Sequence, residues 1–230
     1  MSLLDIMRRA FGLGAPPPVP PTATPAPAVP VSATGDPSAF KGRALRLDLT
    51  DIGRAAADLG CEAACVHAVL AVESNGSGFL PDGRPRILFE AHIFSRETQG
   101  RFDGSHPRVS SPVWNRLLYA GGAGEYPRLT EAIVLDRRAA LRSASWGLFQ
   151  ILGSNHQRCG YASVEEFVAA MCDDEANHLL AFVEFCRIGA LDRALRSHDW
   201  AAFARGYNGP NYAANHYDTK LAAAYAQARP

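Results

Sequence analysis

The sequence has no run of apolar residues long enough to span a membrane, and its N-terminus lacks the order of a secretory signal. In residues 1–13 the charges of Arg8 and Arg9 follow the apolar residues instead of preceding them, and no small-residue cleavage site closes the segment. These absences predict a chain that is made in the cytoplasm without a signal peptide or a membrane anchor.

An excess of charge of either sign is also missing. The chain has 23 basic and 23 acidic residues, and only two of the basic residues, Lys41 and Lys220, are lysines. A balanced chain exerts no long-range attraction on a nucleic acid or an anionic membrane. We therefore expect no nucleic-acid partner.

Cysteine usage excludes two further classes of protein. Five cysteines are an odd number for a disulfide-stapled secreted module, and no C-x-x-C pair provides the close ligands of a zinc site. Cys61 and Cys65 lie one helical turn apart, and the other three occur in later segments. We interpret the thiols as small buried side chains and expect neither a metal nor a cofactor.

The composition divides the chain into three parts. Residues 1–13 form a short amphipathic segment, for which docking to a membrane surface or to a partner is an open alternative. Residues 14–37 contain nine of the 16 prolines, which predicts an extended linker. Residues 38–230 then form one compact domain, because 47% of the chain is apolar and 20% is charged, as in ordinary globular proteins.

The apolar spacing in the compact domain predicts a mostly helical fold. Thr50 is expected to cap a helix that stops at Gly60, and a second helix ends at Glu73. The sequence LPDGR then predicts a tight turn within a small β-hairpin, whereas residues 100–128 are mostly loop. Further helices are predicted over 129–141, directly after Ser145, from a capping box of Ser163 and Glu166 through Met171, over 174–186, after Asp199, and through KLAAAYAQA at the end.

Glu73 lies where an apolar helical run gives way to glycine-rich sequence. A carboxylate at a helix C-terminus meets the negative end of the helix dipole, and apolar neighbours penalise its ionised form. Both effects raise its pKa, as a general acid that works near neutral pH requires. The apolar positions that precede it at helical spacing are Cys65, Val66, Val69, Leu70 and Val72.

A second carboxylate, Glu90, follows seventeen residues later at the end of RILFE. Cleavage of a glycosidic bond requires an acid for the leaving oxygen and often a second carboxylate that acts directly or through water. Glu90 has two alternative interpretations, as a cap at the end of a strand or as an ion-pair partner of Arg86. Asp103 is a third candidate carboxylate, for which a role in an ordinary turn is the alternative.

Three short strings resemble the motifs of goose-type lysozymes and bacterial lytic transglycosylases. They are VESNGSGF, SWGLFQI and YNGPNY. Longer strings in the same order are similar to the N-acetylmuramidase domain of phage endolysins and prophage lysis enzymes, over about residues 40–225. These longer strings are GRPRILFEAHIF, GRFDGSHP, SASWGLFQILGSNH, CGYASVEEFVAAM and DWAAFARGYNGPNY.

This resemblance implies a lysozyme-like α+β fold, mostly helical, with a small β-hairpin after the helix that carries the catalytic glutamate. It implies that Glu73 is the catalytic acid and Glu90 a second functional carboxylate. The residues that it places against the substrate in the cleft are Ser145, Gln150, Tyr207 and Asn208.

Each of these cleft residues has a structural alternative. Ser145 can serve only as a helix cap, and Gln150 can satisfy backbone groups. Tyr207 can be a core aromatic residue whose hydroxyl reaches the surface. Trp146 and Phe149 are expected in the core.

The expected activity is hydrolysis of the β-1,4 bond from N-acetylmuramic acid to N-acetylglucosamine in peptidoglycan. If Glu90 is the base of an inverting reaction, its carboxyl group is expected about 6.5–9.5 Å from that of Glu73, against about 5–5.5 Å for a retaining nucleophile. We expect the wider separation.

Three alternatives stay open: a lytic transglycosylase that forms an anhydro product, a catalytically inactive glycan-binding module, and a delivered toxin or tail component. The expected partner is the glycan strand of peptidoglycan, in the periplasm or cell wall. A monomer would reach it through a holin-like pore or a delivery apparatus.

Overall fold

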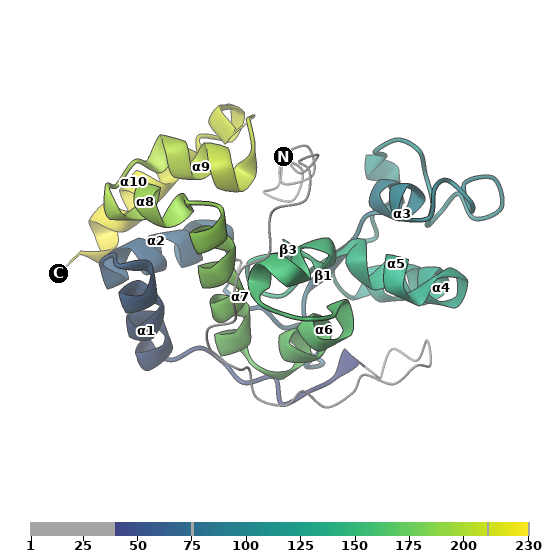
Figure 1. The fold of residues 1–230 in the computed structure, drawn as a ribbon, viewed down its shortest axis with the longest axis horizontal. Coiled ribbons are helices and arrows are strands. Elements are labelled where there is room, and N and C mark those ends of the chain that lie inside the picture. The colour runs from purple at the N-terminus through teal and green to yellow at the C-terminus, as the bar shows by residue number, and fades with distance from the viewer. Residues whose placement is uncertain (1–39, 75, 211, 230) are drawn as a thin grey trace. The chain divides into compact units, whose positions relative to one another are not determined.

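The computed structural model describes residues 40–74, 76–210 and 212–229. The predicted N-terminal segment, 1–13, and the linker, 14–37, lie outside the described residues. The described chain forms two compact units (Figure 1). Unit 1 contains Leu47–Gly76 and the chain from Phe182 onward, and unit 2 contains residues 40–46 and Ser77–Ala181.

Unit 1 is built from helices. Within it, the second helix, α2, packs against both α10 and α1. Helix α7 begins in unit 2 and ends in unit 1. The helices are α1 (Leu49–Leu59), α2 (Ala63–Glu73), α7 (Glu175–Ile188), α8 (Leu191–Arg196), α9 (Trp200–Asn208) and α10 (Tyr217–Ala228), with a 3-10 helix at Tyr212–Asn215.

The N-terminus of α1 is capped by Asp48 instead of the predicted Thr50. The Asp48 side chain accepts a hydrogen bond from the backbone N–H of Asp51, and the Asp51 side chain accepts one from the N–H of Asp48. This reciprocal capping box satisfies two donors, so the helix begins one residue before Thr50. The predicted stop is confirmed, because Gly60 adopts the left-handed conformation with φ 66°.

Unit 2 combines short helices with a three-stranded antiparallel sheet of order β1-β2-β3. Ser145 lies in the central strand, opposite Leu88 on one side and Leu152 on the other. The elements are β1 (Ile87–Phe89), α3 (Ala91–Glu97), α4 (Glu125–Leu135), α5 (Arg137–Arg142), β2 (Ala144–Trp146), β3 (Ile151–Leu152) and α6 (Val164–Asp173), with 3-10 helices at Arg116–Leu118, Gly122–Gly124 and Gly153–Cys159. The prediction of a mostly helical fold with a small β element is confirmed.

The prediction of a helix after Ser145 is wrong. The segment forms β2, a tight turn and β3, and the turn places Gly147 at φ 71° and Gln150 at φ 50°. The Trp146 indole N–H donates to the Leu141 carbonyl at 3.1 Å, which fixes the strand against α5. A short apolar run suits a buried strand as well as a helix, and pairing with β1 decides between them.

The predicted helix over 129–141 is two helices, α4 and α5, and α4 begins earlier, at Glu125. Asp136 interrupts them in an extended conformation, φ −160°, and its carboxylate accepts from the Ala139 N–H at 3.0 Å. Asp136 therefore starts a new helix instead of continuing the old one. The helix caps predicted at Ser163 and Asp199 are confirmed, and the short helices α3 and α8 were not predicted.

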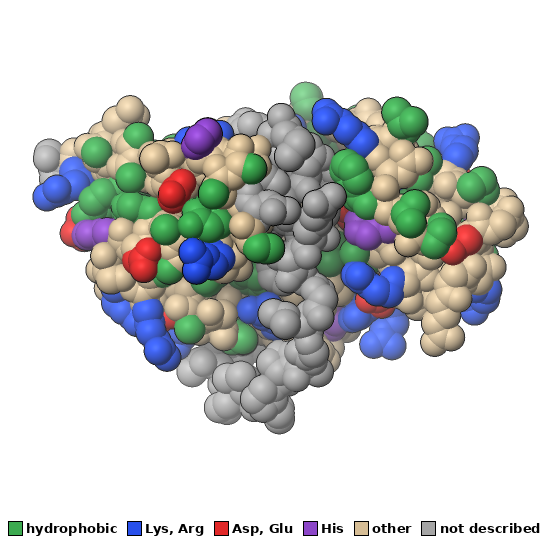
Figure 2. Space-filling view, turned by 90° about the horizontal axis from the view of Figure 1, so that it is seen from above, with side chains coloured by type: hydrophobic (Ala, Val, Ile, Leu, Met, Phe, Trp, Pro, Cys, Tyr) green, Lys and Arg blue, Asp and Glu red, His purple; other side chains and the backbone are tan. Residues whose placement is uncertain are grey.

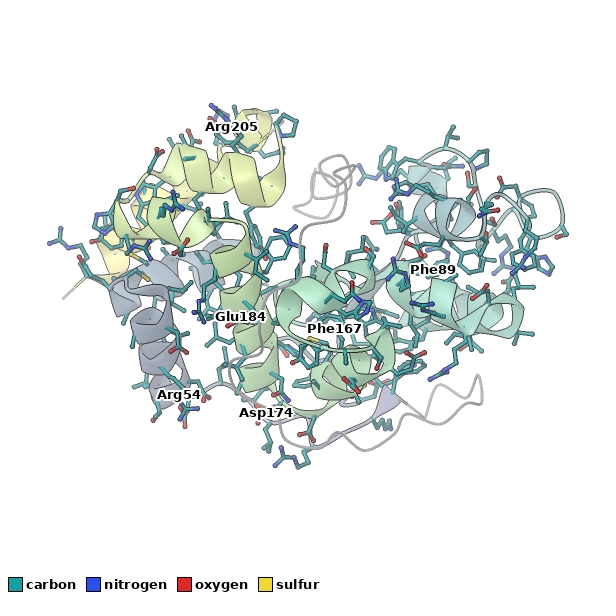
Figure 3. The ribbon with its side chains drawn as sticks, viewed as in Figure 1. Arg54, Phe89, Phe167, Asp174, Glu184 and Arg205 are labelled. Atoms are coloured by element: carbon teal, nitrogen blue, oxygen red, sulfur yellow. The ribbon has the colours of Figure 1, made fainter. Side chains whose placement is uncertain are left out.

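Aromatic side chains fill the core of each unit (Figure 3). In unit 2, Phe40 packs against Tyr126 and Trp146, with ring centroids 5.6 and 5.7 Å apart. Phe89 and Phe167 are fully buried, whereas Arg54 on α1 and Arg205 on α9 are exposed. On the face that Figure 2 shows, basic, acidic and apolar side chains are dispersed, in keeping with the balanced net charge.

All five cysteines are free thiols, and four of them are buried, as predicted. Burial raises the pKa of the Cys172 thiol to about 12, so this side chain stays protonated at neutral pH. Within residues 40–229, no single helix is long and apolar enough to cross a membrane. Together, the strongly bent pair α1 and α2 meets the criterion for a membrane-spanning segment, by length and composition only.

A buried ion pair joins β1 to the loop before α4. The Glu125 carboxylate accepts from Arg128 Nη1 at 2.7 Å, from the Phe89 N–H at 3.3 Å, and from the N–H groups of Ala120 and Gly121, both at 2.8 Å. Arg128 also donates to the Phe89 carbonyl at 2.9 Å. Both charged side chains are buried, so each compensates the other for the loss of water.

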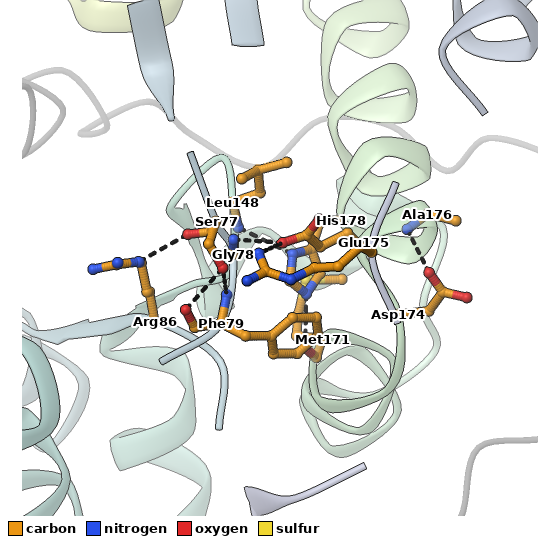
Figure 4. A network of polar contacts seen from close by, with 11 residues as sticks. Ser77, Gly78, Phe79, Arg86, Leu148, Met171, Asp174, Glu175, Ala176 and His178 are labelled. Atoms are coloured by element: carbon orange, nitrogen blue, oxygen red, sulfur yellow. Dashed lines mark hydrogen bonds and ion pairs between the residues drawn. The ribbon is translucent and has the colours of Figure 1, made fainter. Parts of the chain in front are cut away.

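A second buried network attaches two loops to α7 (Figure 4). The Glu175 carboxylate accepts from the Gly78 N–H at 2.7 Å and from Arg46 at 2.9 Å. His178, one turn later, accepts from the Leu148 N–H at 3.0 Å and donates through Nε2 to the Met171 carbonyl at 2.7 Å. The loop after α2 and the turn between β2 and β3 are therefore anchored on one face of α7.

Two glycines make room for the His178 ring. A Cβ atom at Gly78 would lie 2.5 Å from His178 Nδ1, and one at Gly147 would lie 2.8 Å from the ring. Gly147 also has φ 71°, which other residues rarely adopt. The histidine therefore explains why glycine stands at both positions. Burial lowers the pKa of His178 to about 4, so the imidazole is neutral at neutral pH.

The buried pair predicts a large effect of Arg128→Ala. The substitution leaves the Glu125 charge buried without its cation, and we expect the free energy of unfolding to fall by about 3–5 kcal/mol. Urea titration monitored by circular dichroism measures this loss. Arg187→Ala is the matched control, because Arg187 forms an exposed pair with Glu184 at the same i,i+3 spacing. It should cost less than about 1 kcal/mol, and equal losses in the two variants would contradict the prediction.

The neutral His178 predicts a dependence of stability on pH. Its pKa in the folded state lies below the ordinary value of 6.5, so the unfolded chain takes up the proton first as the pH falls. The histidine should cost about 1–2 kcal/mol of stability between pH 6.5 and pH 5. Urea midpoints across this range measure the slope, which His178→Gln should reduce. A slope in the His178 variant equal to that of the wild type would refute this assignment.

Candidate functional site

Glu73 is the last residue of α2, as the sequence predicts. The helix ends because Ser74 is extended and both its N–H and its hydroxyl bond to the Leu70 carbonyl, at 3.0 and 2.6 Å. The backbone of Glu73 is thus placed at the negative end of the helix dipole. Its side chain lies outside the described part of the structure, so the expected separation from the Glu90 carboxyl group stays a prediction.

Glu90 lies in unit 2, directly between β1 and α3, where it is the N-cap residue of α3. Its backbone N–H donates to the Ser143 carbonyl at 2.9 Å, and the residue is only 3% exposed. The Tyr119 hydroxyl donates to Glu90 Oε2, and His92 Nδ1 lies 3.4 Å from the same oxygen. Glu90 is therefore a buried carboxylate that is surrounded by polar side chains.

The contacts of Glu90 support neither of its two alternative interpretations. Arg86, the proposed ion-pair partner, directs its Nε to the Ser77 carbonyl at 2.8 Å. Glu90 does follow a strand, yet its side chain makes no capping hydrogen bond to α3. The contacts with Tyr119 and His92 are those of a carboxylate that is oriented by other side chains.

The loop that carries Tyr119 is held by the buried ion pair. The N–H groups of Ala120 and Gly121, the next two residues, both donate to Glu125, and the same carboxylate accepts from the N–H of Phe89, the residue before Glu90. One buried anion therefore fixes both the strand end that carries Glu90 and the loop that supplies its hydrogen-bond donor.

Ser145 and Gln150 lie in unit 2, in the segment with β2 and β3. Ser145 is 8% exposed in the central strand, where it caps no helix. The Gln150 side-chain amide donates to the carbonyls of Arg86 and Gly147, at 3.1 and 2.7 Å, so it satisfies backbone groups. This contact stabilises the turn that the left-handed Gln150 closes.

Tyr207 and Asn208 end α9 in unit 1, and both are fully buried. The Tyr207 ring stacks on Phe203 with centroids 5.5 Å apart and meets Phe182 and Phe185 edge-on. The structure thus gives Tyr207 the contacts of a core aromatic residue. Trp146 and Phe149 are buried, as predicted.

Asp103 stabilises a loop. Its two carboxylate oxygens accept hydrogen bonds from the hydroxyls of Ser95, at 3.0 Å, and Ser110. The interpretation as a turn aspartate agrees with these contacts, because the bonds tie residues 103–110 to α3.

Sequence reasoning did not identify Tyr119, Glu175 and His178. Tyr119 lies in a glycine-containing loop with no periodic pattern, and its partner Glu90 is 29 positions away. Glu175 and His178 share one helix face at i and i+3 within a mostly apolar helix, which is a usable signal for a buried polar contact.

Comparison with known proteins adds to this geometry. The family model described as Muramidase, N-acetylmuramidase, matches residues 62–229. Among solved structures, the chain is similar to the Burkholderia AP3 phage endolysin, with 43% sequence identity and a TM-score of 0.76 over 80% of this chain and 71% of the endolysin. The search of curated proteins gave no match.

These similarities confirm the resemblance that the sequence motifs indicate. The helical fold with its small antiparallel sheet is the lysozyme-like α+β fold predicted above. Because the family match spans most of the chain, and includes both Glu73 and Glu90, the protein belongs to the N-acetylmuramidase family of peptidoglycan-cleaving glycosidases.

Proposed function

We propose that the protein hydrolyses the β-1,4 bond from N-acetylmuramic acid to N-acetylglucosamine in peptidoglycan, with Glu73 as the general acid. The position of Glu73 carries this proposal: it ends α2 within VESNGSGF, inside the family match. The similarity to a phage endolysin supports the same class of activity.

In the proposed reaction, Glu73 gives its proton to the glycosidic oxygen. At the same time, the bond between that oxygen and the anomeric carbon of N-acetylmuramic acid breaks. Water forms the new bond to this carbon, and its proton passes to Glu90. In the transition state, positive charge develops on the sugar ring, and a nearby carboxylate stabilises this charge. The helix dipole at the end of α2 favours the protonated form of Glu73 before the reaction.

The surroundings of Glu90 support its role as the second carboxylate. The Tyr119 hydroxyl fixes the orientation of the acceptor oxygen of Glu90. The carboxylate is 3% exposed and also lies beside His92, so the side chains around it set its position. An oriented carboxylate is what a base for an incoming water molecule requires.

We propose that Ser145, Gln150, Tyr207 and Asn208 shape the surface that binds the glycan. Full burial of Tyr207 and Asn208 favours an indirect role, in which they hold the Y-N-G-P turn for contact with sugar. The amide of Gln150 plays the corresponding part for the turn after β2. Access through a holin-like pore or a delivery apparatus, and action as a monomer, stay predictions.

Glu73→Gln should retain the fold and lose activity. The amide has nearly the same shape as the acid but cannot give up a proton, and general acid catalysis contributes about 100- to 10,000-fold. Turbidity loss of a peptidoglycan suspension measures the rate. Glu131→Gln, at a partly exposed position on α4, is the control and should match the wild type. Clearing by Glu73→Gln at the wild-type rate would remove Glu73 from the reaction.

The mass of the products tests the proposed bond and mechanism together. Hydrolysis adds a water molecule and leaves N-acetylmuramic acid at the reducing end, because the liberated carbon takes the hydroxyl. We expect mass spectrometry of digested peptidoglycan to show these products. Anhydro-muramic ends would identify a lytic transglycosylase, and binding to the pellet without release of reducing ends would identify an inactive glycan-binding module.

A further inference from the structure

We propose that a cavity beside α3 binds the peptide stem of peptidoglycan, at a stem residue that carries both an ammonium and a carboxylate group. This inference rests on the proposed function, because it assigns a second part of the same substrate. The cavity lies wholly within unit 2 and has a volume of about 520 Å³. Its lining includes His92, Ser95, Arg96, Gln99, Asp103 and Pro112.

Arg96 provides a cation for a carboxylate. Its side chain is exposed, and none of the ion pairs among the described residues includes it. Neighbouring arginines differ: Arg101 pairs with Asp136 at 3.1 Å and Arg142 pairs with Glu97 at 2.7 Å. A guanidinium that is not used within the fold can bind a carboxylate through two parallel hydrogen bonds.

Asp103 provides the opposite charge. Each of its oxygens accepts one hydroxyl hydrogen bond, from Ser95 or Ser110, and an ionised carboxylate has about four acceptor sites. Acceptor capacity therefore remains for an ammonium group. The hydroxyls hold the carboxylate in place, and no basic side chain within the described residues neutralises it. The lining thus contains one fixed anion and one available cation.

His92 connects this cavity to Glu90. The imidazole lines the cavity, and its Nδ1 lies 3.4 Å from Glu90 Oε2. In the substrate, the peptide stem is attached to muramic acid, the sugar whose bond is cleaved. A site for the stem is therefore expected within a short distance of a carboxylate that acts on that sugar.

The opposite charges of Arg96 and Asp103 favour some chemical groups of peptidoglycan over others. A neutral sugar hydroxyl would desolvate the guanidinium and the carboxylate without supplying opposite charge. A diamino acid such as diaminopimelic acid carries an ammonium and a carboxylate on one carbon and satisfies both. A lysine side chain at the same stem position ends in an ammonium group with no carboxylate on the same carbon. The cavity should therefore favour stems with diaminopimelic acid.

The test compares reducing-end release from three substrates: peptidoglycan with diaminopimelic acid stems, peptidoglycan with lysine stems, and glycan stripped of stems by an amidase. We expect the wild type to cleave the first fastest. Arg96→Gln should lose about tenfold in rate on that substrate, as expected for one charged contact of about 1.4 kcal/mol. It should match the wild type on stripped glycan.

Arg54→Gln, at an exposed arginine of α1, is the control and should change none of the three rates. Asp103→Asn should lower the rates on both stemmed substrates and spare stripped glycan, and its circular dichroism spectrum reports whether the loop contact still permits folding. Equal effects of Arg96→Gln on all three substrates, or no effect on any, would overturn the proposal.

A binding measurement keeps this inference separate from the proposed function. Calorimetric titration with the free tripeptide L-Ala–γ-D-Glu–meso-diaminopimelic acid should show saturable binding to the wild type and weaker binding to Arg96→Gln. Binding with no cleavage of any substrate would refute the proposed hydrolysis and leave the stem site supported. Cleavage with no tripeptide binding and no preference among the stems would do the reverse.

Discussion

The buried carboxylate of Glu125 is the contact on which the organisation of unit 2 depends. It accepts hydrogen bonds from a strand, from a loop and from Arg128, and these partners are not adjacent in the sequence. A buried anion is costly unless its acceptor sites are filled, so the cost of desolvation selects the arrangement in which all three partners are present. Glu90 and Tyr119 lie next to the backbone groups that this anion holds.

Helix α7 has a corresponding role for two of the strings that resemble lysozyme motifs. Glu175 and His178 bind backbone groups of Gly78 and Leu148, which belong to VESNGSGF and SWGLFQI. Gly78 and Gly147, one glycine from each string, are therefore explained by packing against a histidine that neither string contains. Residues in a motif that resembles a catalytic signature can therefore be required for packing.

The sequence was sufficient for the family, the helical class and the end of α2 at Glu73, because these depend on local periodicity, capping and long matching strings. It was insufficient where partners are distant. The apolar run after Ser145 becomes a strand only because β1 is present to pair with it. Likewise, Asp48 displaced Thr50 as a cap because it makes two reciprocal hydrogen bonds, although both residue types favour that position.

The same limit applies to the site. Glu90 could be selected as a carboxylate after a strand, but its contacts with Tyr119 and His92 bring together positions on separate segments. Gln150 and Tyr207 were selected by resemblance, and their hydrogen bonds and ring contacts show that such residues can be retained to stabilise a turn or a core. Only the three-dimensional contacts distinguish a residue that stabilises the fold from one that binds substrate.

The close fit of Gly78 and Gly147 around His178 has an evolutionary consequence. Because one ring occupies the space of two missing methyl groups, the three positions are not independent. In homologues where the imidazole is replaced by a smaller side chain, the steric demand for glycine at position 78 disappears. At position 147 the left-handed backbone still favours glycine. The identities of residues 78 and 178 are therefore coupled, whereas glycine at 147 is also required by its backbone.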